Sequence, residues 1–133
     1  MAGPSDPQFA EGVTVPLIEV NLDRKLYEEK GEGISREIHQ AQIDALGIAP
    51  EDLFQVFNPH EPGELKFDPT YGGVDRRSLM VIRITIVHRH SVVVKKGLYT
   101  AILDRLAVIG IRPDDVQIAL VENGFEDWFA GKL

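Results

Sequence analysis

The feature that most constrains this chain is a seven-residue segment that occurs twice, the second copy 63 residues after the first. The copies are Gly47-Ile48-Ala49-Pro50-Glu51-Asp52-Leu53 and Gly110-Ile111-Arg112-Pro113-Asp114-Asp115-Val116. Many helices end in this way, because glycine adopts the left-handed conformation after the last turn and proline cannot continue a helix. Here each copy is also preceded by a helix-period stretch and, before that, by a β-rich run. We therefore predict a β-α-β unit followed by a second β-α-β unit.

The spacing of apolar residues places both units in one domain, 15–133. The units cover about 15–58 and 79–122, with strands where apolar residues alternate and helices where they recur every three or four positions. The expected strands are 15–22, 53–57, 79–90 and 116–122, and the expected helices are 25–46 and a second one that Ser91 caps. The predicted fold class is α+β: a tandem β-α-β repeat that forms a four-stranded sheet with two helices on one face.

Three segments lie outside these elements. Residues 1–14 hold two prolines, two glycines and little apolar content, so they are expected to form a flexible tail. Residues 59–78 hold three prolines and three glycines and are expected to form a long irregular connection. Connections of that length in a compact domain are usually functional or disordered. Residues 124–133 are expected to form a short aromatic tail.

The second face of the predicted sheet is left uncovered by the two helices. It combines apolar and polar side chains: Val81, Val87, Val121, Leu17 and Phe54 with Glu19, Gln117 and Arg83. A monomer would expose this mixed face to water. We therefore expect an oligomer that packs these sheet faces together across a partly hydrated interface.

Composition excludes several classes of partner. The net charge of −7 is spread along the chain, whereas binding to nucleic acid or to an anionic membrane requires a clustered basic face. No apolar run approaches the roughly 18 residues that span a bilayer, and the N-terminus has no signal-peptide pattern. The chain has no cysteine, which favours a reducing compartment. We expect a cytoplasmic protein that binds neither nucleic acid nor membrane.

Several stretches resemble the tautomerase superfamily and, within it, the malonate semialdehyde decarboxylase group. They are Pro16-Leu17-Ile18, the segment of His39 and Asp44-Ala45-Leu46-Gly47, Asp52-Leu53-Phe54-Gln55, His60-Glu61-Pro62-Gly63-Glu64, Pro113-Asp114-Asp115-Val116, Ala119-Leu120-Val121-Glu122-Asn123 and Asp127-Trp128. The resemblance implies two β-α-β units, assembly as a homotrimer, no cofactor, and an amino-terminal proline that acts as acid, base or nucleophile on small oxo acids or haloacids. The implied ligand is a small carboxylate or oxo acid.

Pro16 aligns with the family's catalytic proline, yet in this chain it is internal. A terminal amine has a pKa of roughly 7.7 to 8.0, whereas an amide nitrogen has no useful basicity. Proline at the start of a strand is also structurally ordinary, since its missing N–H costs nothing there. Val15, however, stands where the family has its initiator Met, and a GTG start codon is read as Val if the start is placed upstream. Translation from Val15 as Met, followed by removal of that Met, would expose Pro16.

Asp52 aligns with the carboxylate that the decarboxylase group is proposed to use, together with the proline, to activate or orient water. A structural interpretation competes with this one. Asp115 occupies the same position in the second copy of the repeat, so both aspartates are candidates for turn or strand-entry hydrogen bonds.

His88-Arg89-His90 departs from the resembled pattern. The decarboxylase group has two arginines one residue apart that hold the substrate carboxylate, and they align with His88 and His90. On a strand these two histidines would share a face and Arg89 would point away from them, unless the strand already ends at Val87. Histidine is only partly charged at pH 7 and lacks the bidentate geometry of arginine. We therefore expect weaker and pH-dependent carboxylate binding, or a different substrate.

Two further interpretations involve these residues. A His-x-His pair could bind a metal ion with Asp52, Glu64 or His60 as third ligand, but local spacing places only two ligands, so no metal is predicted. Trp128 could form an apolar wall over the site, or it could cover the edge of the sheet.

The sequence leaves two functions open. The first is a small-oxo-acid decarboxylase or tautomerase in which Pro16 is the amine, Asp52 orients water, and His88, Arg89 and His90 surround the carboxylate. The second is a non-catalytic or diverged relative, a binding module that lacks the free amine. A ferredoxin-like regulatory domain is a weaker alternative, since no ligand motif supports it.

Overall fold

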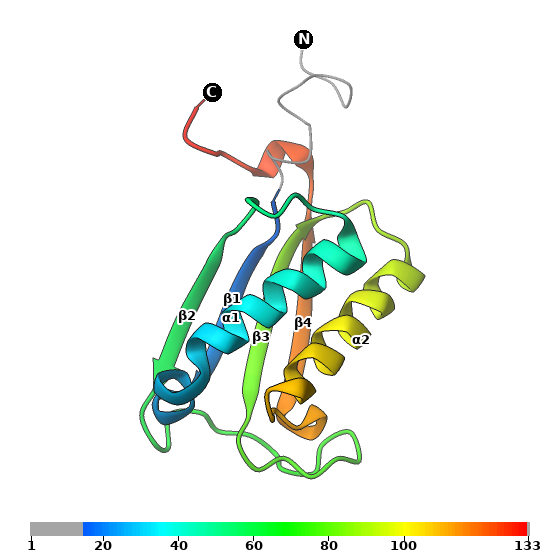
Figure 1. Cartoon of the computed structure of the whole chain (residues 1–133). Coiled ribbons are helices and arrows are strands. Elements are labelled where there is room, and N and C mark those ends of the chain that lie inside the picture. Colours follow the sequence, from blue (N-terminus) through cyan, green and yellow to red (C-terminus); the bar gives the residue numbers. More distant parts are fainter. Residues whose placement is uncertain (1–14, 133) are drawn as a thin grey trace.

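The computed structural model describes residues 15–132, so the tail predicted at 1–14 lies outside the described residues. A four-stranded sheet of order β2-β1-β3-β4 carries both helices on one face (Figure 1). The elements are β1 (Leu17–Asp23), α1 (Arg24–Leu46), β2 (Gln55–His60), β3 (Met80–Val87), α2 (Val92–Val108) and β4 (Val116–Asn123), with short 3₁₀ turns η3 (Pro113–Asp115) and η4 (Phe125–Asp127). No helix within 15–132 is long and apolar enough to cross a membrane. The predicted fold class is confirmed.

Each half of the fold is a strand, a helix and a second strand parallel to the first. β1 pairs with β2 in parallel and β3 pairs with β4 in parallel, while β1 and β3 run antiparallel and join the halves. Asp23 caps the start of α1, and Ser91 caps α2 by accepting a hydrogen bond from the Val94 N–H at 3.2 Å. Gly47 and Gly110 follow the helices with φ of 70° and 86°, as the repeated segment predicted.

The core lies between the sheet and the two helices. Alternate strand residues and one stripe of each helix are buried there. The fully buried members are Ile18, Val20 and Leu22 of β1, Ile34, Ile38 and Ala41 of α1, Met80, Ile82 and Ile84 of β3, and Leu98, Ile102 and Leu106 of α2. At the surface, Arg105 of α2 joins the helices through ion pairs with Glu37 and Asp44 of α1.

The bounds of β2 and β3 differ most from the sequence-based expectation. β2 runs from Gln55 to His60 instead of 53–57, because it pairs along the whole of β1, from Ile18 opposite Gln55 to Asp23 opposite His60. It accommodates a proline at position 59 because an edge strand has only one neighbour. β3 ends at Val87, where its partner β4 also ends, and Ser91 already caps the next helix. The expectation that β3 reaches residue 90 is therefore wrong.

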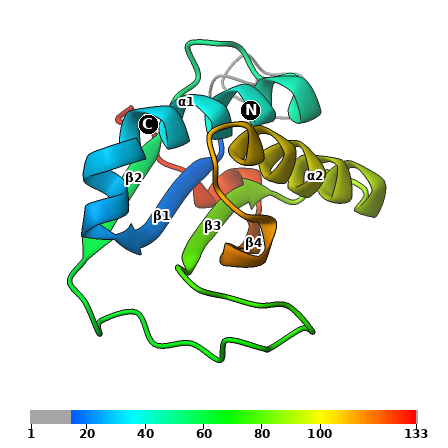
Figure 2. The same ribbon diagram turned by 60° about the horizontal axis from the view of Figure 1, so that its bottom comes forward.

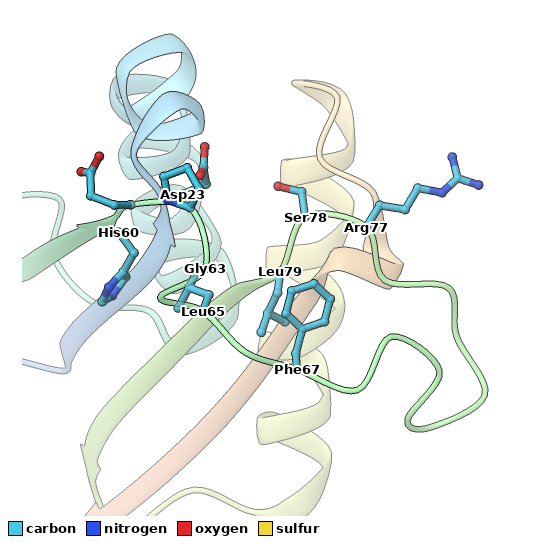
Figure 3. A pocket seen from close by; sticks show the side chains of 10 residues that line it. Asp23, His60, Gly63, Leu65, Phe67, Arg77, Ser78 and Leu79 are labelled. Atoms are coloured by element: carbon cyan, nitrogen blue, oxygen red, sulfur yellow. The ribbon is translucent and has the colours of Figure 1, made fainter.

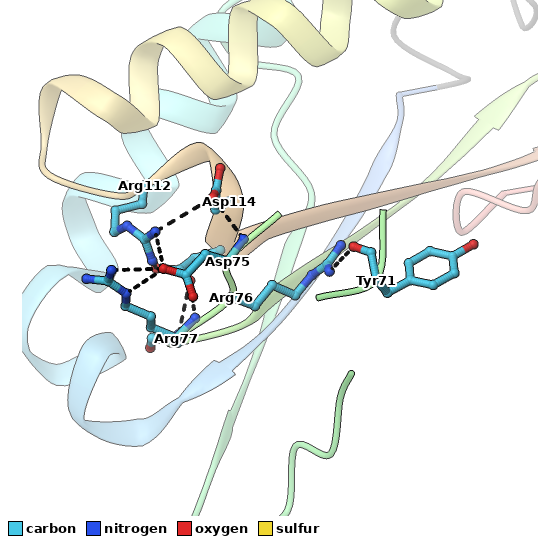
Figure 4. A network of polar contacts seen from close by, with 8 residues as sticks. Tyr71, Asp75, Arg76, Arg77, Arg112 and Asp114 are labelled. Atoms are coloured by element: carbon cyan, nitrogen blue, oxygen red, sulfur yellow. Dashed lines mark hydrogen bonds and ion pairs between the residues drawn. The ribbon is translucent and has the colours of Figure 1, made fainter. Parts of the chain in front are cut away.

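The connection between β2 and β3 lies at the end of the sheet where β1 finishes (Figure 2). Polar contacts hold its last part against η3, as Figure 4 shows for the charged residues of the network. The Asp75 N–H donates to Asp114 at 3.0 Å, and Arg112 of the second repeat forms an ion pair with Asp75 at 3.5 Å. Arg76 donates to the carbonyl of Tyr71. This connection is therefore tied to the second repeat.

The sheet face away from the helices is mixed and largely open. Phe54, Val56 and Val121 are 62%, 46% and 46% exposed. Glu19 of β1 and Arg83 of β3 lie opposite each other on it. Val87, which was expected on this face, is instead 2% exposed. The remaining open surface is the one predicted to mediate assembly.

Candidate active site

The N-terminal end of β1 brings together segments that are distant in the sequence. A small hollow there is lined by Pro16, Leu46, Ile48, Ile86, Val87, Arg89 and His90. Its free volume is about 10 Å³, which is about the room that one water molecule needs. Three of the residues singled out from the sequence, Pro16, Arg89 and His90, therefore line one hollow. It lies where β1 begins and β3 ends, and Figure 1 shows that these strand ends are at the end of the sheet opposite the long connection.

Pro16 lies directly before β1 and is buried. The preceding Val15 is also buried, at 6% exposure. The neighbouring Ile18 N–H donates to the carbonyl of Phe54 at 3.0 Å, which ties the start of β1 to the segment before β2. The Pro16 nitrogen is acylated by Val15 in this chain, so it carries no basic lone pair.

Asp52 closes a turn at the same end of the sheet. Its N–H donates to the carbonyl of Ala49 at 3.0 Å, and the turn carbonyl of Pro50 lies 2.6 Å from Nε2 of His39 on α1. The Oδ2 atom of Asp52 is buried and has no hydrogen-bond partner. Buried carboxylate oxygens without a partner are rare, and a catalytic role is one of the reasons for which a protein keeps one. Asp52 is thus half-buried in a turn that does not use its Oδ2.

Asp115, the equivalent residue of the second repeat, is bound quite differently. Its Oδ1 accepts hydrogen bonds from the N–H groups of Arg77 at 2.7 Å and Ser78 at 3.1 Å, and Arg112 donates to the same carboxylate. Asp115 is 7% exposed. Its carboxylate anchors the connection to β3, which is a structural role that Asp52 does not share.

The His88-Arg89-His90 segment follows β3, and its side chains lie in two different environments. Because β3 ends at Val87, the segment is not part of the strand, and the condition under which the two histidines would share a face is not met. His88 turns to Glu122 of β4, whose carboxylate lies 2.8 Å from its Nδ1 and 2.8 Å from Nζ of Lys95. The Lys95 hydrogen bond, with a smaller effect of His88, lowers the pKa of Glu122. Arg89 and His90 line the hollow beside Pro16.

The electrostatics of the hollow differ from those of a pair of arginines. Burial lowers the pKa of His90, and the Arg89 guanidinium lowers it further. Lys95 acts in the same direction, while Glu122 opposes it. His90 is therefore mainly neutral at pH 7, and Arg89 supplies the permanent positive charge next to Pro16.

Trp128 lies after η4 and is half-buried. Its Nε1–H donates to Oδ1 of Asn123 at 2.7 Å, and the Asn123 carbonyl accepts from the His88 N–H at 2.7 Å. Asn123 thus links the C-terminal segment to the residues after β3. Trp128 is not one of the described residues that line the hollow beside Pro16.

Of the three residues named as a possible third metal ligand, His60 and Glu64 lie at the other end of the sheet, 4.0 Å from each other. His60 ends β2 opposite Asp23, and it belongs with Leu65 and Phe67 to a second hollow of about 170 Å³ beneath the long connection (Figure 3). That hollow is at the far end of the sheet from His90. Within residues 15–132, no three His, Asp or Glu side chains lie close enough together to hold a metal ion.

Two polar residues of α1, toward the end of the sheet where Pro16 and the turn of Asp52 lie, were assigned no role from the sequence. Nδ1 of His39 is buried without a partner, and so is Nε2 of Gln42, whose residue is 2% exposed. Their signal in the sequence is weak, because a polar residue every third or fourth position is also what a solvated helix face shows.

Comparison with known proteins identifies relatives of the whole domain. The model of the family described as tautomerase enzyme matches residues 52–131. The "Probable tautomerase YusQ" of Bacillus subtilis (strain 168) is 34% identical over 119 residues, which cover 88% of this chain and 94% of the relative. The crystal structure of FG41 malonate semialdehyde decarboxylase inhibited by 3-bromopropiolate has a TM-score of 0.81 at 29% identity, covering 86% of this chain and 88% of that one. Native fused 4-OT has the same fold, with a TM-score of 0.73 at 15% identity, over 88% of this chain and 94% of that one.

Proposed function

The chain belongs to the tautomerase superfamily, and from this premise we propose that it acts on small oxo acids at the hollow beside Pro16, once Pro16 is the first residue. In this proposal the Pro16 amine is the acid or base, Asp52 orients water, and Arg89 with His90 holds the substrate carboxylate. The reaction is a tautomerisation or a decarboxylation of the kind named for the malonate semialdehyde decarboxylase relatives.

The observation that carries the proposal is the meeting of Pro16, Arg89 and His90 in one hollow at the start of β1. A buried proline beside a permanent cation is the environment that lowers the pKa of a terminal amine toward neutrality. The same cation attracts a carboxylate. Asp52 supports the assignment, since its Oδ2 is buried and takes no part in a hydrogen bond.

The intact chain lacks two requirements of this chemistry. Its Pro16 nitrogen is an amide, and the hollow of about 10 Å³ is smaller than any oxo acid. Removal of residues 1–15 provides the amine and takes away the Val15 side chain, which is buried next to Pro16. Translation from the codon of Val15, with loss of the initiator Met, is the simplest route to this form.

The mature N-terminus tests that route. The protein is produced from its natural upstream DNA, without a designed start codon, and its intact mass is measured. We expect a species that begins at Pro16. A preparation in which every molecule retains residues N-terminal to Pro16 would contradict the enzymatic proposal for the native protein.

The alternative is a diverged relative that binds a small carboxylate without turning it over. One observation favours it: the His88 side chain, which aligns with one of the family's arginines, is paired with Glu122 and is 75% exposed. Among the described residues that line the hollow, Arg89 alone then offers a permanent charge to the ligand. In that case a carboxylate would bind to the hollow of the trimmed chain with no change in the ligand.

We further propose that three copies assemble through the open sheet face. Two of the fused 4-OT structures are described as asymmetric and symmetric trimers, and they have the same fold. The open face of this chain combines exposed Phe54, Val56 and Val121 with charged residues, which suits an interface that is partly hydrated.

Sedimentation velocity at micromolar concentration checks the assembly. We expect a species of three times the mass of one chain, because a monomer would leave the apolar part of this face in water. Val56→Arg together with Val121→Arg should shift the population toward monomer without loss of helix content, since both side chains are already exposed in the single chain. A wild-type protein that sediments as a monomer would contradict the proposal.

A further inference from the structure

We propose that His39 is a positioning residue, one that fastens the turn of Asp52 to α1 so that the Asp52 carboxylate remains free for chemistry. This inference rests on the proposed function in one respect only, namely that Asp52 is the group that orients water. The contact of His39 with the turn is independent of that function. The reason for it follows from a comparison of the two repeats.

The contact between His39 and the turn has a defined polarity. Nε2 of His39 lies 2.6 Å from the carbonyl oxygen of Pro50, and a carbonyl oxygen only accepts hydrogen bonds. The imidazole therefore donates from Nε2, while its Nδ1 is buried without a partner. Pro50 is the second residue of the turn that Asp52 closes through its own N–H to Ala49. His39 thus holds the backbone two residues from the carboxylate.

The second repeat anchors its corresponding turn without a histidine. The residue 63 positions after His39 is Ile102, which is fully buried in the core and offers no hydrogen bond. There the turn is anchored by the Asp115 carboxylate itself, which accepts from the Arg77 and Ser78 N–H groups. One repeat uses its aspartate as the anchor, and the other uses a helix histidine.

The free state of Asp52 Oδ2 follows from this division. A buried oxygen without a partner disfavours the fold locally, and it persists only where the surrounding structure holds the residue in place. In the first repeat, the hydrogen bond from His39 to the Pro50 carbonyl connects this turn to a side chain of α1. His39 therefore anchors the turn, and Oδ2 of the Asp52 carboxylate remains available to a water molecule or a substrate.

The test compares His39→Leu, which has no donor, with His39→Gln, whose side-chain amide has an N–H at about the reach of Nε2. Both are made in the chain that begins at Pro16, and kcat and KM are measured separately. We expect His39→Leu to lower kcat by about tenfold or more while KM changes little, since a misplaced catalytic group costs rate and not binding. His39→Gln should restore kcat to within about threefold of the wild-type value.

A matched control and a double variant separate positioning from general destabilisation. His60→Leu also removes a histidine hydrogen bond, to Asn21 at 2.8 Å, but at the far end of the sheet, so its kcat should be unchanged. His39→Leu combined with Asp52→Asn should be no slower than Asp52→Asn alone, because His39 acts through that carboxylate. Fully additive losses, or an unchanged kcat in His39→Leu, would overturn the proposal.

Hydrogen exchange in the intact 133-residue chain gives a readout that needs no turnover. The Asp52 amide should exchange about tenfold faster in His39→Leu than in wild type or His60→Leu, and the Asp115 amide should be unaffected. If the trimmed chain turns over no oxo acid, the proposed function fails while this measurement still decides whether His39 holds the turn. Unchanged exchange of the Asp52 amide would overturn the positioning role on its own.

Discussion

A chain cut so that Pro16 is the first residue is expected to turn over small oxo acids at least about a hundredfold faster than the 133-residue chain, which should show little or no activity. The physical reason is the nitrogen of Pro16. As an amide it has no useful basicity, whereas as a terminal secondary amine it titrates near pH 7.7 to 8.0 before the effects of burial and Arg89. Turnover of a panel of small oxo acids by both forms measures the difference.

A covalent probe supplies the control for that experiment. 3-Bromopropiolate inhibits the malonate semialdehyde decarboxylase relative. On the trimmed chain, the Pro16 amine should attack the carbon that carries bromine and expel bromide, so that a peptide containing Pro16 gains the mass of the bromine-free adduct. A chain cut to begin at Leu17 keeps every residue of β1 but lacks the proline amine, so it should show neither activity nor that label. If the intact chain is as active as the trimmed one, the amine mechanism is wrong. Arg89 and His90 are then the next residues to test as acid or base.

The pH dependence of the trimmed form follows from the same groups. His90 has a pKa below its ordinary value of about 6.5, so it gains its charge, and strengthens carboxylate binding, only as pH falls below that value. The Pro16 amine loses its base form as pH falls through its own pKa. If the amine acts as a base, KM should decrease toward acid while kcat also decreases, and kcat/KM should have a narrow optimum.

The second large effect separates the two repeat aspartates. Asp52→Asn in the trimmed chain is expected to lower kcat by about a hundredfold or more, with a change in unfolding free energy below about 0.5 kcal/mol, because Oδ2 has no partner to lose. Asp115→Asn is expected to leave kcat nearly unchanged and to lower the unfolding free energy by about 1–3 kcal/mol. That residue accepts from the Arg77 and Ser78 N–H groups and from Arg112.

Urea denaturation and steady-state kinetics on the two variants give these quantities directly. Equal losses of stability with unchanged turnover in both would show that the two aspartates have one common role, that of closing their turns. The intact chain can be used for the stability part, so this arm remains informative even before a substrate is found.

Local chemistry determined most of the fold. The glycine of each repeated segment adopts positive φ after its helix, and Ser91 caps α2, because these residues satisfy the backbone wherever the helix ends. The alternation of apolar residues along β1 and β3 indicates which face of each strand is buried, since successive side chains on a strand point in opposite directions. Such patterns are legible in the sequence because neighbours along the chain decide them.

Strand boundaries needed the partner strands. The end of β3 at Val87 depends on where β4 stops, and the extension of β2 to His60 depends on the length of β1. Hydrogen bonding between strands joins residues that are distant in the sequence, so periodicity alone placed these ends two or three residues away. The consequence for the site is direct, because the break after Val87 sends His88 to Glu122 while Arg89 and His90 line the hollow with Pro16.

The sequence by itself determined the two β-α-β halves and the apolar residues that form their core. It also indicated Pro16 and Asp52 as candidate site residues. The tertiary structure alone decided that Asp52 and Asp115, identical in their repeats, differ in use. A carboxylate acquires its role from the donors that reach it, and those donors come from the connection at residues 77 and 78 in one repeat and are absent around Oδ2 of Asp52 in the other. The partners of a buried charge are a property of packing, which the order of residues does not display.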